Sequence, residues 1–228
     1  PYGKHYNIPM ISMGDGITKY FDEDGFYDWY FGDKLHPNNR GYKLMSDCIM
    51  NLMDTVDNAQ ADTDNITDID AMAPKTTAAY QGMKMIDANT KAEDDDALIS
   101  IDAGSFTAKD SATGNFQYEY KGQKSASWFA DNWMHTKDAA NDALTVKLNC
   151  KTLMFVYKLS SSSSFGPADV YIDGEKKGTL NGYDSSGWNN GKVFVAMTNE
   201  EVAEHTIEIK MADESAAKNF TLMAIGFN

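Results

Sequence analysis

From residue 98 to the end of the chain, apolar and polar residues alternate in short runs with a period of two. This is the pattern of half-buried β-strands, because successive side chains of a strand point to opposite faces. The stretch Asp173-Gly174-Glu175-Lys176-Lys177-Gly178, between two such runs, suits the turn of a hairpin. The β-like runs are residues 98–102, 116–120, 144–148, 154–157, 170–172, 193–195, 206–210 and 220–225. About eight antiparallel strands of this kind predict a β-sandwich, of the jelly-roll type, over residues 98–228.

The first 54 residues follow a different pattern, that of an α/β structure. Residues 8–13 form a short apolar run that ends at Gly-Asp-Gly, which predicts a buried parallel strand. A helix is expected to begin at Asn38 or Asn39. Its apolar stripe contains Tyr42, Met45, Ile49 and Leu52, at steps of three and four residues, with Leu44, Cys48 and Met53 beside it. Residues 1–54 therefore read as strand, long aromatic loop and helix.

Residues 55–97 are predicted to be an acidic linker between these two parts. Six aspartates and no lysine or arginine occur from Asp54 to Asp70, and Glu93 opens a second acidic run. Asp62-Thr63-Asp64 has the alternation of a calcium loop but lacks the glycine and glutamate that such a loop needs at later positions. We therefore expect no cofactor and no metal ligand here, and leave open a structural calcium ion in the β-sandwich.

Charge and composition exclude several partners. The chain has 228 residues and a net charge of −14, which disfavours nucleic acid and anionic membrane as partners. No apolar run approaches the roughly 18 residues that a membrane span needs. Cys48 and Cys150 are expected to be thiols and not a disulfide. The chain begins at Pro1 without a methionine, so we expect a fragment, and its compartment, cytoplasmic or secreted in a bacterium, is left open.

The residues with the most chemical information are Asp33 and His36. An aspartate three residues before a histidine, in a loop that leads into a helix, can bring its carboxylate to Nδ1 of the imidazole. The contact would fix the tautomer and leave Nε2 free to accept a proton from a nucleophile. On spacing alone, the alternative is that Asp33 is a turn residue and His36 a helix-entry residue packed by Pro37.

Residues 32–42 read Gly-Asp-Lys-Leu-His-Pro-Asn-Asn-Arg-Gly-Tyr. The string Asp-x-x-His-Pro-Asn-x-x-Gly-Tyr, before a closing amphipathic helix, resembles the last conserved block of the SGNH (GDSL-type) hydrolases. The resemblance covers residues 1–54 and implies the C-terminal piece of a flavodoxin-like α/β/α sandwich. It implies a serine esterase, many of which deacetylate carbohydrates, with His36 as general base and Asp33 as its orienting partner.

The nucleophilic serine block of that family and the blocks that supply its oxyanion hole have no counterpart in this sequence. Met13-Gly14-Asp15-Gly16 looks like the serine block, with Gly16 in place of the serine, but it stands too late in the chain. An imidazole without its alcohol cannot carry out acyl transfer. We therefore expect this chain alone to be inactive, with the N-terminal part of the SGNH domain as its partner.

The β-like part resembles the carbohydrate-binding-like jelly rolls appended to carbohydrate esterases of fibre-degrading gut bacteria. Sugar binding needs flat aromatic faces with amides and carboxylates beside them. The candidates are Trp188 with Tyr183 and Asn189, and Trp133 in a second aromatic stretch that also contains Trp128. The alternative for each tryptophan is packing in the core. His205 is expected to be a structural residue at the start of a strand.

The leading hypothesis is the C-terminal portion of a serine carbohydrate esterase, an acetylesterase that acts in polysaccharide degradation on acetylated plant polysaccharide or oligosaccharide. The alternative is a non-catalytic carbohydrate-binding module. A structural protein without a ligand is a weaker third possibility.

Overall fold

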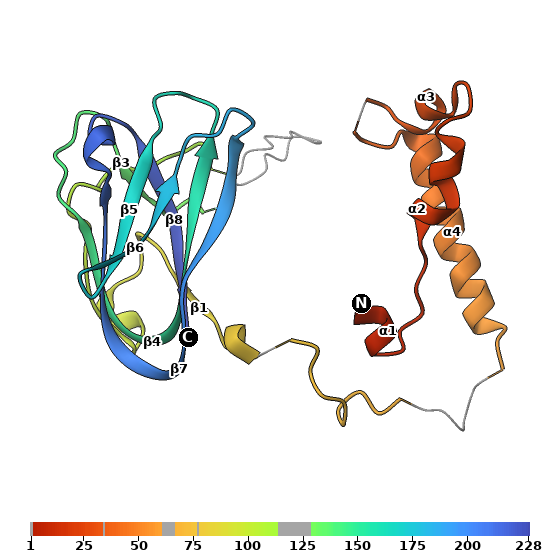
Figure 1. The fold of residues 1–228 in the computed structure, drawn as a ribbon, viewed down its shortest axis with the longest axis horizontal. Helices are drawn as coiled ribbons and strands as arrows, with labels where there is room; N and C mark the ends of the chain where they lie inside the picture. Colours follow the sequence, from red (N-terminus) through yellow and green to blue (C-terminus); the bar gives the residue numbers. More distant parts are fainter. Residues whose placement is uncertain (1, 34, 61–66, 77, 114–128) are drawn as a thin grey trace. The chain divides into compact units, whose positions relative to one another are not determined.

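The structure is a computed structural model, and it describes residues 2–33, 35–60, 67–76, 78–113 and 129–228. It divides into two compact units, Pro1–Thr77 and Ala78–Asn228 (Figure 1). The predicted strand at 116–120 and Trp128 lie outside the described residues. None of the helices in the described ranges has the length and apolar character that crossing a membrane requires.

The first unit is helical where it is described. It contains α1 (Tyr2–His5), α2 (Met13–Ile17), the 3-10 turn η1 (Thr18–Tyr20), α3 (Phe26–Tyr30) and the long helix α4 (Asn39–Asp57). The predicted helix start is confirmed, because Asn38 is the N-cap of α4 and its side chain accepts hydrogen bonds from the backbone N–H groups of Arg40 and Gly41.

The parallel strand predicted at residues 8–13 is not formed. Ile8, Met10 and Ile11 are exposed, and Pro9 has no N–H to give to a neighbour. A strand needs at least one neighbouring strand to pair with its backbone N–H and C=O groups. The described residues of Pro1–Thr77 contain no strand that could pair with it. The structure therefore does not show an α/β/α layer in this unit.

The second unit is an antiparallel β structure with three 3-10 turns, η2 (Ala78–Tyr80), η3 (Ala92–Asp94) and η4 (Asp213–Ser215). Its strands are β1 (Lys84–Ile86), β2 (Leu98–Asp102), β3 (Trp133–His135), β4 (Leu144–Ser160), β5 (Pro167–Ile172), β6 (Glu175–Asn181), β7 (Trp188–Met211) and β8 (Phe220–Phe227). The sheet order is β1-β8-β4-β7-β5-β6, with β2 on β4 and β3 on β8.

Two long, curved strands turn this sheet into a sandwich (Figure 1). The first half of β4 pairs with β2 and with the second half of β7. The second half of β4 pairs with the first half of β7 and with β8. Register shifts follow Cys150 and Leu153, where the strand passes from one layer to the other. The antiparallel β-sandwich predicted from the alternation is confirmed, although four predicted strands merge into β4 and β7.

The core lies between the two layers, and most of its members are inward side chains of β4, β5, β7 and β8. Its largest fully buried members are Phe106, Phe155, Phe220, Phe227, Leu144, Leu148, Leu153, Leu180, Ile207, Ile209, Met211 and Leu222.

The loop Asp173-Gly174 joins β5 to β6 with positive φ at both residues, as a type I′ hairpin requires. Residues 78–97, the last part of the predicted linker 55–97, belong to this unit, and β1 within them pairs with β8. Cys48 is half-buried, Cys150 is buried, and both are free thiols.

Candidate functional site

The loop between α3 and α4 is a small closed turn that presents Asp33 and His36. The backbone N–H of Gly32 donates to the carbonyl of His36 at 2.8 Å, and Phe31 and Pro37 form an antiparallel bridge. These contacts join the two ends of the turn directly. The loop is therefore fixed by its own backbone and holds the two side chains at a defined separation.

Asp33 is oriented by three hydrogen bonds. Its Oδ1 accepts from the backbone N–H groups of Leu35 at 2.7 Å and His36 at 2.6 Å. Its Oδ2 lies 2.8 Å from Nδ1 of His36. This is the contact that the spacing of the two residues predicts. One oxygen holds the carboxylate on the loop, and the other is left to orient the imidazole.

His36 faces solvent with its second ring nitrogen. Its side chain is 63% exposed, and none of the described residues is hydrogen-bonded to Nε2. Because the ionised Asp33 accepts a hydrogen bond from Nδ1, the neutral ring carries its proton on Nδ1 and its lone pair on Nε2. The pair can therefore accept a proton at Nε2, which is the property of a general base. Its role in catalysis stays a prediction.

Asn38 fastens this loop to the helix. Its Nδ2 donates to the carbonyl oxygens of Trp29 at 2.8 Å and Phe31 at 3.1 Å, while its Oδ1 accepts from Arg40 and Gly41 at the helix start. One side chain thus satisfies groups on both sides of the turn. The asparagine in the string quoted above has a structural reason: a shorter or apolar residue could not bridge α3 and α4.

Gly41 permits the close approach of α4 to α3. A Cβ atom at this position would lie 2.4 Å from the carbonyl oxygen of Tyr30 and 2.9 Å from Cβ of Pro37. Any other residue would push the helix away from the turn. The glycine of the string is therefore required by packing, and the packing sets the position of His36.

The Asp33 carboxyl is expected to titrate far below its usual range. The hydrogen bond from the His36 side chain, followed by the backbone N–H groups of His36 and Leu35, lowers the pKa of Asp33 from 3.8 to about 2. Since the folded pKa lies below the unfolded one, this stabilisation is present above about pH 4 and is lost as the pH falls towards 2. Side-chain ¹³C titration should show it, with a higher pKa of Asp33 in His36→Ala. A value near 3.8 in the unsubstituted chain would contradict the geometry.

Two substitutions at Asn38 separate its two tasks. Asn38→Asp keeps the capping oxygen but replaces the donor that serves Trp29 and Phe31 with a second acceptor. We expect it to retain α4 and to broaden the His36 Nδ1–H resonance. Asn38→Ala loses the cap as well and should lower the free energy of unfolding of this unit by about 1 kcal/mol. Circular dichroism and ¹H NMR measure the two effects, and an unchanged His36 resonance in Asn38→Asp would refute the positioning role.

The apolar stripe predicted on α4 is present and largely uncovered. Tyr42, Ile49 and Met53 are exposed, and in the described part of the unit only Tyr30 and Gly41 are buried. Beside the helix lies a cavity of about 560 Å³, lined mainly by apolar residues of α2, α3 and α4 such as Met13, Phe26 and Leu44. A stripe and a cavity of this kind indicate a surface that packs against something else.

Two of the predicted sugar-binding aromatics lie close together at one end of the sandwich. Trp188 is the register partner of Ser160, and Tyr183 forms a bridge with the same Ser160. Their backbones are therefore two strand spacings apart, about 10 Å. Trp188 is 46% exposed and Tyr183 39%. Asn189 is the extra residue of a bulge at this point, with φ of 66°.

Trp133 is not available as a sugar platform, contrary to the prediction. It lies in β3 and is 3% exposed, and it belongs to the core cluster of the sandwich. A ring buried in this way has no face to offer to a pyranose. The structure agrees with the other interpretation of Trp133, packing in the core. β3 pairs with β8, and the Trp133 side chain points into the sandwich.

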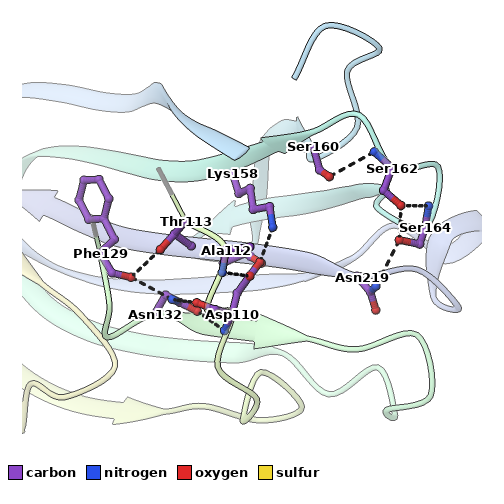
Figure 2. A network of polar contacts seen from close by, with 11 residues as sticks. Asp110, Ala112, Thr113, Phe129, Asn132, Lys158, Ser160, Ser162, Ser164 and Asn219 are labelled. Atoms are coloured by element: carbon purple, nitrogen blue, oxygen red, sulfur yellow. Dashed lines mark hydrogen bonds and ion pairs between the residues drawn. The ribbon is translucent and has the colours of Figure 1, made fainter. Parts of the chain in front are cut away.

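Sequence reasoning missed two hydrogen-bonded side-chain pairs that the fold brings together. Asp110 and Lys158 form a buried pair at 2.7 Å (Figure 2). The hydroxyl of Thr221 donates to the same carboxylate oxygen at 2.7 Å. Asp173 and His205 form a second aspartate–histidine pair, with Oδ2 and Nδ1 2.7 Å apart. The partners are 48 and 32 residues apart, so no local motif could have indicated either pair.

The described residues contain no group of three or more histidine, cysteine, aspartate or glutamate side chains that could hold a metal ion. The sequence-based expectation of no cofactor and the open question of a calcium ion both stay predictions.

Comparisons with known proteins identify the fold. No family model matches the chain, and no curated protein matches it. The crystal structure of a two-domain esterase (CEX) active on acetylated mannans is similar over 99% of this chain, with a TM-score of 0.68 and 19% identity. The same esterase co-crystallised with mannopentaose gives a TM-score of 0.65 over 99% of the chain, also at 19% identity. The chain spans 57% and 56% of those chains. It shares its fold with a large part of a two-domain carbohydrate esterase.

Proposed function

We propose that this chain is the C-terminal portion of a serine carbohydrate esterase of the SGNH type that removes acetyl groups from polysaccharide or oligosaccharide. The observation that carries the proposal is the Asp33–His36 pair, joined at 2.8 Å and held by a loop that is fixed to two helices. The fold similarity to an esterase active on acetylated mannans supports the same reaction class.

In the proposed reaction, a serine hydroxyl supplied from outside this chain attacks the ester carbonyl. His36 Nε2 takes the hydroxyl proton as the Oγ–C bond forms, and then gives it to the leaving sugar oxygen as the ester C–O bond breaks. Water repeats the sequence on the acyl-enzyme and releases acetate. Asp33 remains ionised and stabilises the imidazolium that forms in both steps. Donors for the oxyanion, worth about 3 kcal/mol each, would come from the same outside segment as the serine.

The exposed apolar surface of Pro1–Thr77 supports a partner segment. The α4 stripe and the cavity beside Leu44 are the kind of surface that an α/β domain buries between its layers. We propose that the N-terminal part of the SGNH domain covers this surface and brings the serine to His36. Without it, the chain has the base of the active site but no nucleophile, and we expect no esterase activity from it.

The alternative is a non-catalytic carbohydrate-binding module, and the exposed aromatics of the sandwich favour it. Tyr183 and Trp188 are exposed aromatic residues whose backbones lie about 10 Å apart, and Asn189 follows Trp188 directly in β7. In the esterase, the same residues would hold the polysaccharide from which the acetyl group is removed. The two functions are therefore separated by ester hydrolysis and not by sugar binding.

Replacing Trp188 with alanine tests the binding surface. Since exposed stacking residues at the centre of a binding site contribute at least about 1.4 kcal/mol, Trp188→Ala should weaken binding of soluble acetylated mannan about tenfold or more. Affinity electrophoresis measures this. Val202→Ala removes an exposed apolar side chain elsewhere on β7 and should leave binding unchanged. Equal retardation of both variants would contradict the assignment.

The function itself is tested on the protein in its natural full-length form. We expect release of acetate from acetylated mannan, and intact-mass analysis should identify a serine-bearing segment that accompanies these 228 residues. Binding of mannan without any release of acetate would favour the module over the esterase.

A further inference from the structure

The β-sandwich contains a second aspartate–histidine pair, far from the first in the sequence and in a different setting. Asp173 lies in the β5–β6 turn and His205 in β7. Oδ2 of Asp173 is 2.7 Å from Nδ1 of His205, and Oδ1 accepts from the backbone N–H of Thr206 at 2.9 Å. Unlike the exposed ring of His36, the His205 side chain is 11% exposed. The fold therefore buries an oriented imidazole here.

Nε2 of His205 is buried and has no hydrogen-bond partner among the described residues. The backbone N–H of Thr206, followed by His205 itself, lowers the pKa of Asp173, so the carboxylate stays ionised and can only accept. In the neutral ring, Nδ1 then carries the proton and Nε2 carries the lone pair. A buried acceptor without a donor is costly, and a native structure that keeps one calls for an explanation.

His205 lines a cavity of about 410 Å³ between the β5–β6 hairpin and the middle of β7. The volume is within the range of small-molecule sites. Thr198, Asn199 and Lys177 give the wall hydroxyl, amide and ammonium groups, while Ile172 and Met197 give it apolar surface. A wall of polar groups set among apolar ones is typical of a site for a compound with both hydroxyl and C–H surface.

The charges of the wall select a neutral ligand. Both carboxylates are occupied, Asp173 by Thr206 and His205, and Glu175 by Lys177 at 2.5 Å. They are also too few to hold a metal ion, since no metal-binding cluster occurs in the described ranges. An anion would meet two carboxylates and one lysine, so it is disfavoured as well. A neutral hydroxyl can donate to Nε2 and meets no repulsion.

We propose that this cavity binds one neutral sugar residue, with a sugar hydroxyl as the hydrogen-bond donor to His205 Nε2. The hydroxyl chemistry follows from the cavity, whereas the choice of a sugar rests on the proposed carbohydrate function. The site is distinct from the Tyr183–Trp188 surface, because β6 separates Asp173 from Tyr183 by seven residues, about 20 Å of strand. One sandwich would then contact a polysaccharide at two ends.

Because Nε2 is buried, the sugar has to displace part of the wall. Lys177 and Glu175 are the long side chains that line the cavity, and their ion pair is partly exposed to solvent. Exposed pairs of this kind contribute little, so exchanging the pair for a sugar hydroxyl costs little. In this proposal, Lys177 and Glu175 are the side chains that move aside when the sugar enters the cavity.

The test uses ¹⁵N-labelled chain and long-range ¹H–¹⁵N NMR of the histidine rings, with His205 assigned through His205→Phe. Methyl α-D-mannopyranoside should shift Nε2 of His205 saturably, and glycerol at the same hydroxyl concentration should not. Thr198→Val removes a wall hydroxyl without disturbing Asp173 or His205, and should weaken the sugar's effect at least threefold. In His205→Phe, the sugar should no longer shift the Asn199 side-chain amide. Trp188→Ala should leave the sugar-dependent shift of His205 Nε2 unchanged.

The proposal is overturned if the sugar produces no saturable shift, if glycerol shifts Nε2 equally, or if His205→Phe still shows the sugar-dependent shift at Asn199. Retention of mannan in affinity electrophoresis then separates a failure of this cavity proposal from a failure of the proposed carbohydrate function. If mannan is still retained through Trp188, this cavity alone is wrong; if mannan is not retained either, the carbohydrate function falls with it.

Discussion

Replacing His36 with alanine is expected to lower kcat/KM for acetyl release by the natural full-length protein about 10⁴-fold or more. The reason is that, in the mechanism we propose, Nε2 of His36 is the base that activates the serine, and the described residues around the loop offer no second histidine that could replace it. Asp33→Asn should cost about 10⁴-fold by stabilising the wrong tautomer of the ring. Acetate release from acetylated mannan measures both.

His5→Ala is the matched control, since His5 belongs to the same unit and bonds the carbonyl of Ala73 rather than a carboxylate. It should keep the activity of the unsubstituted protein. Near-normal activity of His36→Ala, in a protein whose circular dichroism is unchanged, would eliminate the proposed mechanism.

Replacing Asp110 with alanine is expected to destabilise the β-sandwich by about 3–5 kcal/mol, because it leaves the Lys158 ammonium buried without its counter-ion. Lys158 is 3% exposed and Asp110 7%. Burial alone would raise the pKa of Asp110, but the hydrogen bonds from Lys158 and Thr221 outweigh it and the pKa is lowered. The carboxylate is therefore charged in the folded state, and its removal takes the full electrostatic interaction away from Lys158.

This pair also belongs to a wider polar network (Figure 2). Asn132 accepts from the backbone N–H of Asp110 at 2.9 Å and donates to the carbonyl oxygens of Asp110 and Phe129. Lys158 lies 4.5 Å from the centre of the Phe165 ring. The network joins the segments on both sides of residues 114–128 to the sheet, so its disruption should affect the whole sandwich.

Urea denaturation followed by tryptophan fluorescence measures the loss. Lys109→Ala is the control, since Lys109 pairs with Asp131 on the exposed surface and should cost at most about 1 kcal/mol. The double variant Asp110→Leu, Lys158→Met should be less destabilised than Asp110→Ala alone, because it removes both charges. A loss below 1 kcal/mol in Asp110→Ala would show that Lys158 finds water or another partner.

The sandwich could be predicted from the sequence because alternation is a local property that the fold preserves. β2, β5 and β8 lie where the alternation predicts them. β6 was missed because its sequence, Glu-Lys-Lys-Gly-Thr-Leu-Asn, is that of a charged edge strand and has little apolar alternation. The prediction of a strand at residues 8–13 was wrong although its apolar run is suited to a sheet. A sheet also needs neighbouring strands, and the described residues of Pro1–Thr77 contain none.

In the candidate sites, too, contacts between residues close in the sequence could be predicted, and contacts between distant residues could not. Asp33 and His36 are three residues apart, so one turn brings them together, and the sequence could indicate their contact. Asp173–His205 and Asp110–Lys158 depend on the pairing of distant strands and could not be foreseen. Trp133 and Trp188 were both predicted to bind sugar, and whether each ring is buried depends on the face of the sheet to which its side chain points. What a single sequence lacks is tertiary context, and not chemistry.

The central claim is that the Asp33–His36 pair activates a serine that lies outside these 228 residues. The most direct measurement is intact-mass and peptide analysis of the natural full-length protein after treatment with a fluorophosphonate, in which the activated Oγ displaces fluoride and forms a P–O bond. We predict one adduct, on a serine outside this chain, that forms in the unsubstituted protein and in His5→Ala but not in His36→Ala. An adduct on a serine of this chain, or labelling that persists unchanged in His36→Ala, would contradict the account.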